Sequence, residues 1–270
     1  MTIEKVPPTL PFVPYYDADG IVIFHGNCLE LMKNIPEGSV DMTMCDPPYG
    51  TTNCRWDTVI DLPLMWEQLN RVTKKRRAIV MTASQPFTSV LVTSNIKNFK
   101  TAWVWDKVSQ PTGHLNAKKY PLKIHEDIIQ FSNGSPFYNP VMESGEPYNV
   151  TRVTFNGANV YGKESINCLK SISNGERYPR TIQSIPRSRK ERGLHPTQKP
   201  VALMQYLIKT YTNPGETVLD FAMGSGTTLV AARLEGRKAI GIEISEEYCE
   251  VAVKRLIDMS VKPTKSNDNN

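Results

Sequence analysis

Residues 218–243 read VLDFAMGSGTTLVAARLEGRKAIGIE, and this stretch decides the fold. An apolar segment over 216–222 leads into a turn that contains glycine. A helical pattern over 226–236 and a second apolar segment over 237–244 follow. Strand, turn, helix and strand in this order form the repeating unit of a sheet with parallel strands.

The turn of this unit has the composition of a ligand-binding loop. Gly224 and Gly226 permit a tight turn and a close ligand approach, and the helix that follows presents free N–H groups. Glu243 lies about twenty residues further on, where such folds place an acid on ribose hydroxyls. The third glycine of the pyrophosphate fingerprint and a G-K-[ST] sequence are missing, which favours a nucleoside without phosphates. Alternatively, the glycine turn is a plain connection between a strand and a helix, and Glu243 is a solvated residue at the end of a strand.

The same alternation extends toward the N-terminus. Strands are predicted over 20–26, 39–44, 76–83, 101–108 and 125–132, and helices over 28–35, 62–73, 86–94, 200–212 and 245–260. Such alternation indicates an α/β fold with a doubly wound, mostly parallel sheet. Trp103 and Trp105 alternate at strand spacing, so we expect both to pack in the core. The basic run 74–77 is expected to be the solvated end of a helix.

A second unusual stretch, MCDPPYG over residues 44–50, directly follows a predicted buried strand. Pro47 and Pro48 cannot donate to a sheet, and each restricts the residue before it to extended conformations. The carbonyls of Asp46 and Pro47 can therefore point outward beside the Asp46 carboxylate and the Tyr49 ring. This predicts hydrogen-bond acceptors next to a stacking surface, although a proline-stiffened turn capped by aspartate fits these letters equally well.

Composition excludes several classes of protein. The 270 residues suffice for a sizeable core, and the net charge of +5 is only a weak sign of a polyanionic partner. The five cysteines are scattered without a C-x-x-C pair, so no disulfide framework or zinc site is indicated, and His125 with Glu126 lacks a second ligand cluster. The proline-rich N-terminus has no signal-peptide core, and no apolar run could span a bilayer. We expect a soluble, cytoplasmic protein.

Residues 132–194 interrupt the α/β pattern with a composition rich in Asn, Gly, Ser, Pro and Tyr, too long for an ordinary connection. The expected division is therefore 1–131, an insertion over 132–194, 195–260 and a disordered tail over 261–270. Basic residues interleaved with Tyr, Ser and Gln suit phosphate and base contacts, although most such runs are solvated loops. The candidate DNA-binding residues are Arg177, Arg180, Arg187, Arg189, Lys190 and Arg192.

Three motifs stand in a fixed order around the insertion: DPPY at 46–49, HPTQKP at 195–200 and DFAMGSGTT at 220–228. Together they resemble the motifs of the β-class amino methyltransferases that act on DNA. The resemblance runs from about residue 26 to residue 256. It implies a Rossmann-like methyltransferase sheet with a circularly permuted motif order. In this fold two neighbouring strands are followed by the glycine turn that binds the cofactor and by the DPPY motif. The two flanking segments would be the catalytic and cofactor-binding halves, and the insertion would recognise the target.

The resemblance also implies a set of site residues and S-adenosylmethionine as cofactor, without a metal. The catalytic residues would be Asp46, Pro47, Pro48 and Tyr49. The cofactor would contact Asn27, Cys28, Asp46, Lys199, Asp220, Phe221, Gly224, Ser225, Gly226, Thr227, Thr228 and Glu243. Family members commonly carry Asp at the position of Asn27, and the Phe of their DPFxGSG motif stands one place early here, as Phe221.

The implied reaction is methyl transfer to the exocyclic N6 of an adenine flipped out of double-stranded DNA. Hydrogen bonds from the amino group to Asp46 and to the Pro47 carbonyl would free its lone pair, and Tyr49 would stack on the base. Asp at the first motif position favours adenine. The alternatives are methylation of cytosine N4, methylation of RNA, and a DNA-binding protein without catalytic activity. The expected protein is a monomer or homodimer of bacterial or phage origin, with a possible cognate restriction endonuclease.

Overall fold

The computed structural model describes residues 13–51, 57–156, 165–187 and 198–261. The chain forms two compact units, one of residues 1–139 and 181–270 and a smaller one of residues 140–180. The larger unit contains a nine-stranded sheet. Its order is β1 (Tyr16–Ala18), β2 (Ile21–His25), β13 (Lys238–Glu243), β12 (Thr217–Asp220), β3 (Val40–Cys45), β4 (Thr73–Ala83), β6 (His125–Phe131), β5 (Phe99–Asp106) and β11 (Ile182–Ser184).

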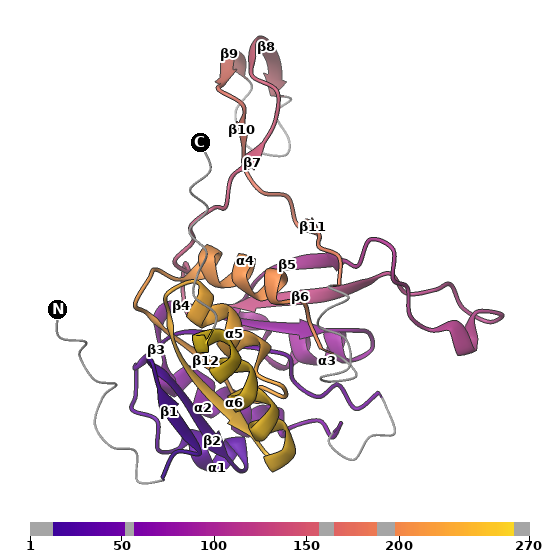
Figure 1. The fold of residues 1–270 in the computed structure, drawn as a ribbon. Helices are drawn as coiled ribbons and strands as arrows, with labels where there is room; N and C mark the ends of the chain where they lie inside the picture. Colours follow the sequence, from indigo (N-terminus) through magenta and orange to yellow (C-terminus); the bar gives the residue numbers. More distant parts are fainter. Residues whose placement is uncertain (1–12, 52–56, 157–164, 188–197, 262–270) are drawn as a thin grey trace. The chain divides into compact units, whose positions relative to one another are not determined.

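Helices cover both faces of this sheet (Figure 1). They are α1 (Cys28–Met32), α2 (Leu62–Val72), α3 (Phe87–Ser94), α4 (Val201–Tyr211), α5 (Thr227–Leu234) and α6 (Glu246–Val261), with short 3-10 turns η1 (Ile96–Asn98) and η2 (His114–Asn116). Successive side chains of β2 serve opposite faces, since Ile21 and Ile23 join one buried cluster and Val22 and Phe24 the other. The predicted doubly wound, mostly parallel sheet is confirmed; β1 and β6 alone pair antiparallel with their neighbours among these nine strands.

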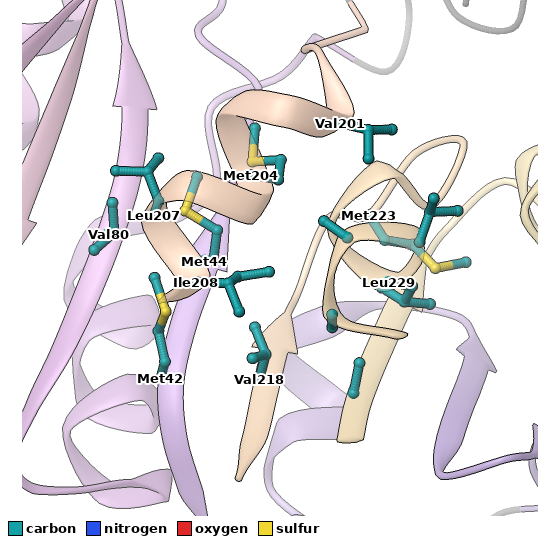
Figure 2. Close-up of a cluster of buried hydrophobic side chains, with 14 of the residues drawn as sticks. Met42, Met44, Val80, Val201, Met204, Leu207, Ile208, Val218, Met223 and Leu229 are labelled. Carbon is teal, nitrogen blue, oxygen red and sulfur yellow. The ribbon is translucent and has the colours of Figure 1, made fainter. Parts of the chain in front are cut away.

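Helix α4 packs directly on the centre of the sheet. Figure 2 shows Leu207 and Ile208 of α4 close to Met42 and Met44 of β3. These side chains are fully buried, as is Val218 of the neighbouring strand β12. Burial of this apolar surface holds α4, and with it the residues just before the helix, against the sheet.

The winding of the sheet reverses between β12 and β3. These two strands pair in parallel, with Val218 opposite Met42. After β12 the chain passes through α5 to β13 on one side, whereas after β3 it passes through α2 to β4 on the other. The carboxyl ends of two strands at such a reversal form the crevice in which α/β sheets bind ligands. Asp220 ends β12 and Asp46 follows the end of β3, so both carboxylates lie at this crevice.

The smaller unit consists of two antiparallel strand pairs. Strand β7 (Glu143–Ser144) pairs with β10 (Glu176–Arg177), and β8 (Tyr148–Asn156) pairs with β9 (Ser165–Ser173). This unit falls within the expected insertion 132–194, whereas residues 132–139 and 181–187 belong to the larger unit. Its role in target recognition stays a prediction.

One sequence interpretation is wrong. The basic run 74–77 is not the end of a helix, because α2 ends at Val72 and Thr73 already has an extended backbone that starts β4. Lys74 pairs with the buried Asp41 at 2.6 Å, and Arg77 pairs with Glu216. The expectation for the two tryptophans is confirmed, since Trp103 and Trp105 are 5% and 0% exposed.

Candidate active site

A cavity of about 520 Å³ opens at the carboxyl ends of β12 and β3. The predicted residues that line it are Asn27, Cys28, Asp46, Pro47, Pro48, Tyr49, Lys199, Asp220, Phe221, Gly224, Ser225, Thr227, Thr228 and Glu243. Three segments far apart in the sequence therefore meet at one site. Gly226 does not line the cavity; its φ of +76° and the 2.7 Å from an added Cβ to the Cβ of Ala252 show that the turn needs glycine there.

The Asp46 carboxylate has two unequal oxygens. Oδ1 accepts hydrogen bonds from the Tyr49 hydroxyl at 2.7 Å, from Lys199 Nζ at 2.7 Å and from the Thr82 hydroxyl. Oδ2 accepts one from Lys199 Nζ, also at 2.7 Å. A carboxylate oxygen has room for about two such bonds, so Oδ1 is saturated while Oδ2 keeps acceptor capacity. Oδ2 is therefore the oxygen that can bind a further N–H donor.

Lys199 lies just before α4 and is almost completely buried. Its ammonium group bridges Asp46 and Glu126, with Glu126 Oε2 at 3.2 Å from Nζ. Burial lowers the pKa of Lys199, but the charges of Asp46 and Glu126 together raise it further, so the net shift is upward. Lys199 thus stays protonated and compensates the charge of Asp46.

Glu126 extends this network away from the cavity. Its Oε1 lies 2.6 Å from Lys107 Nζ and 4.0 Å from Arg187. Burial raises the pKa of Glu126, but Lys199 and Lys107 lower it more, so the carboxylate stays ionised. From the sequence, Glu126 was weighed only as a metal ligand, together with His125. No local signal could have identified it, because Glu126 reaches the site only where the start of β6 lies beside the carboxyl end of β4, with which β6 pairs antiparallel.

Tyr49 is held by its ring and by its hydroxyl. The ring stacks on Phe87 with centroids 5.3 Å apart and an interplanar angle of 21°, and Lys199 Nζ lies 5.4 Å from the ring centroid. Burial, and then the charge of Asp46, raises the pKa of Tyr49, which keeps the phenol protonated as a donor to Asp46. Phe87 and Thr82 were missed by the sequence analysis, because nothing local to the DPPY motif points to them.

The glycine turn is fastened to Glu243. Glu243 Oε2 accepts from the Gly224 N–H at 2.8 Å, and Oε1 accepts from the Ser245 N–H at 2.9 Å. The side chain of Asn27 caps α1 by accepting from Leu29 N at 2.9 Å. Both residues are thus oriented by backbone amides at the wall of the cavity.

These residues fit S-adenosylmethionine. Glu243 is 8% exposed, and among the described residues no lysine or arginine forms an ion pair with it, which leaves acceptor capacity for hydroxyl groups. Gln198 Nε2 lines the same cavity as a buried donor without a partner in the described part of the chain. Asp46 supplies negative charge for a cationic sulfonium. A polar, cationic nucleoside would form hydrogen bonds with these unpaired donors and acceptors.

Asp220 has a strongly perturbed titration. Burial raises its pKa to about 7, against the hydrogen bonds from Thr228, Cys45 and the Ala222 N–H that lower it. Burial likewise raises the pKa of Cys28 to about 11, so the Cys28 thiol stays neutral at the cavity wall.

This titration predicts a pH dependence of stability in the ligand-free protein. Folded Asp220 binds its proton up to about pH 7, whereas the unfolded residue releases it near pH 3.8, so the free energy of unfolding falls as the pH rises between these values. Asp220→Asn removes this contribution, which amounts to up to roughly 4 kcal/mol. In denaturant titrations from pH 4 to pH 8, the free energy of unfolding of the variant should increase relative to that of the wild type as the pH rises. Parallel curves would contradict the assignment.

The candidate DNA-binding residues lie in different places. Arg177 of the smaller unit sits 4.6 Å over the Tyr148 ring and donates to the Glu146 carbonyl, whereas the Arg180 side chain is 84% exposed. Arg187, in the larger unit, lies 5.5 Å from the Trp105 ring centroid beside Glu126. Arg189, Lys190 and Arg192 lie outside the described residues.

The described residues offer no cluster for a metal ion and no membrane-spanning helix. No group of three or more His, Cys, Asp or Glu side chains in that part of the chain could hold a metal ion. Within the same residues, no helix has the length and apolar character to cross a membrane.

Comparisons with known proteins point to one family. A family model described as an N6/N4 DNA methylase matches residues 40–254. The DNA adenine methyltransferase YhdJ of Escherichia coli K12 is 30% identical over 260 residues, which cover 87% of this chain and 82% of YhdJ. The type II methyltransferase M.ScaI of Streptomyces caespitosus is 26% identical, over 90% of this chain and 83% of its own.

Solved structures show the same likeness. The M1.HpyAVI complex with S-adenosylmethionine is 25% identical with a TM-score of 0.58, over 87% of this chain and 99% of its own. The PvuII cytosine-N4-specific DNA methyltransferase, 18% identical, has a TM-score of 0.66 over 94% of this chain and 92% of its own. At 18% identity the second likeness concerns the fold alone.

Proposed function

The chain belongs to the N6/N4 DNA methylase family, and from this premise we propose that it methylates the exocyclic N6 of adenine in double-stranded DNA. The observation that carries the proposal is the state of Asp46, whose Oδ1 is saturated and whose Oδ2 retains acceptor capacity at the cavity. The cofactor-binding residues proposed are those that line this cavity, with Glu243 as the ribose ligand.

The proposed mechanism uses Asp46 Oδ2 and the carbonyl of Pro47 as paired acceptors. An exocyclic amino group is a weak nucleophile, because its lone pair is delocalised into the ring. N–H bonds to these two acceptors favour a pyramidal nitrogen whose lone pair points away from them. Bound S-adenosylmethionine would supply a sulfonium methyl as the electrophile, with the neutral thioether as the leaving group. The amino nitrogen becomes acidic once it carries the methyl and releases one proton to water, so no strong base is needed. Positioning and electrostatics then account for most of the rate.

The charge of Lys199 defines what Asp46 does. An ammonium held at 2.7 Å from both carboxylate oxygens compensates the charge of Asp46 and occupies one acceptor site on each oxygen. Asp46 is therefore a fixed hydrogen-bond acceptor and not a strong general base. The Tyr49 hydroxyl and Thr82 hold Oδ1 in place, so Oδ2 cannot rotate away from the target amino group.

Adenine is the proposed base for two reasons. Asp stands at the first position of the DPPY motif, and the relative YhdJ, which aligns over most of both chains, is named as a DNA adenine methyltransferase. Cytosine N4 is the second candidate, because the family model includes both chemistries. The insertion 132–194, with the exposed Arg180, is proposed to contact the DNA and to read its sequence.

Glu243→Gln is expected to weaken cofactor binding. The amide can accept from only one of the two N–H groups that Glu243 now binds, and it loses the charge that strengthens bonds to ribose hydroxyls. We expect the dissociation constant of S-adenosylmethionine to rise about 10- to 100-fold in calorimetry. Glu247→Gln, an exposed site on α6, serves as control. An unchanged constant in Glu243→Gln would remove this residue from the cofactor site.

The proposed function is tested by expression in a bacterial host that lacks DNA methyltransferases of its own. Digestion of the host DNA and RNA to nucleosides, followed by mass spectrometry, should reveal N6-methyladenine in the DNA. N4-methylcytosine in the DNA would show that the target base is cytosine and not adenine. Methylation confined to RNA would show that the substrate is RNA and not DNA. Sequencing of the modified DNA then maps the target site.

A further inference from the structure

The loop that joins β5 to β6, residues 107–124, has no part in the function proposed above. Figure 1 shows it extending beyond the ends of these two strands. Residues 113–122 are all exposed, and Leu115 is 102% exposed, so it packs on nothing in the described residues. The loop nevertheless has a defined conformation, because Thr112 and Lys123 exchange backbone hydrogen bonds of 2.8 and 3.0 Å and η2 shapes its tip.

Both ends of this β5–β6 loop are fastened at the catalytic edge of the sheet. At one end Lys107 binds Glu126, which in turn binds Lys199 at Asp46. At the other end Lys123 donates to the hydroxyl of Ser84, which directly follows β4. A duplex that delivers a base to Asp46 must therefore pass close to this loop.

The chemistry of the loop suits a duplex. Residues 107–124 contain Lys107, Lys118, Lys119 and Lys123 and neither Asp nor Glu. Lysines on an exposed surface bind phosphates by releasing counterions. A single exposed leucine is ordinary on a protein surface. An unsupported leucine among lysines beside a site that needs a flipped base matches the apolar wedges that proteins insert between base steps.

We propose that the β5–β6 loop docks on the DNA beside the target base. Lys118 and Lys119 contact phosphates, and Leu115 enters the base stack and fills the space that the flipped base leaves. This proposal rests on the proposed function, because only an enzyme that extracts a base from a duplex needs such a wedge. Lys107 has a separate task, since it is buried and holds Glu126.

The phosphate contacts are tested by the salt dependence of DNA binding. Lys118→Ala/Lys119→Ala is compared with Lys97→Ala/Lys100→Ala, which removes two exposed lysines at the opposite end of β5. Binding to a random-sequence duplex is measured in the presence of S-adenosylhomocysteine. The slope of log K against log salt should fall by about 2 in the loop variant and stay unchanged in the control. Equal slopes in both variants would overturn the phosphate contacts.

The wedge is tested with Leu115→Ala against Ile96→Ala, since Ile96 is 63% exposed at the opposite end of β5. On a duplex with the mapped site, Leu115→Ala should lower kcat/KM about tenfold, with its melting temperature and cofactor affinity unchanged. An abasic site opposite the target makes flipping easier and should restore wild-type kcat/KM. A loss that persists on the abasic duplex, or equal behaviour of both variants, would overturn the wedge.

The two tests separate the failure of this proposal from failure of the proposed function. Absence of methylated nucleosides with the wild-type protein contradicts the proposed function. The salt-slope comparison needs neither turnover nor a known site, and it decides the phosphate contacts in either case.

Discussion

Asp46→Ala is expected to lower the rate constant for methyl transfer by about 10³-fold or more. The change removes Oδ2, the acceptor that orients the target amino group, and it also frees Tyr49 and Thr82 from their shared partner. Single-turnover assays with tritiated S-adenosylmethionine measure this loss. The affinity for the cofactor, measured alongside, shows whether the cavity has kept its shape.

Two further variants bracket this result. Asp46→Asn retains one neutral acceptor and should show an intermediate loss, whereas Asp17→Ala, an exposed carboxylate on β1, should behave as the wild type. Turnover of Asp46→Ala within a few-fold of the wild type would refute the role assigned to Asp46.

Lys199→Met is expected to have the largest effect on stability. The ammonium lies between two carboxylates, and its removal leaves Asp46 and Glu126 facing each other without their shared cation. Breaking a buried ion pair in this way costs about 3–5 kcal/mol of unfolding free energy. Urea denaturation at pH 7 measures the loss, and methyl transfer should fall with it because Asp46 is no longer held as a charged acceptor.

A double variant identifies the cause. Lys199→Met/Glu126→Gln should lose less stability than the two single variants added together, because Glu126→Gln removes one of the two like charges that Lys199→Met leaves without their shared cation. Lys33→Met breaks a surface pair with Glu30, where both side chains are more than half exposed, and should cost little. Additive losses in the double variant would contradict the shared-cation account.

The layout of the fold was predictable because its signals are local. Alternation of apolar strands and amphipathic helices predicted the sheet, and proline and glycine marked where β3 and β12 end. The site residues near those two ends followed from the same motifs. The basic run 74–77 misled the interpretation, because its charges are paired by Asp41 and Glu216, both distant in sequence.

The part of the site that sequence could not predict depends on pairing between distant strands. Thr82 and Glu126 reach Asp46 and Lys199 only because β4 lies beside β3 and β6 runs antiparallel to β4. No periodicity encodes that register. Tyr49 was predicted to offer a face for stacking. Phe87 already stacks with its ring, so stacking of a flipped base on Tyr49 stays a prediction.

The most direct measurement is incubation of the purified protein with unmethylated duplex DNA and S-adenosylmethionine that carries a deuterated methyl group. The DNA is then digested to nucleosides and analysed by mass spectrometry, with Asp46→Ala in parallel. The account predicts deuterated N6-methyladenine from the wild type and none from the variant. Label in N4-methylcytosine, or in no nucleoside at all, would contradict it.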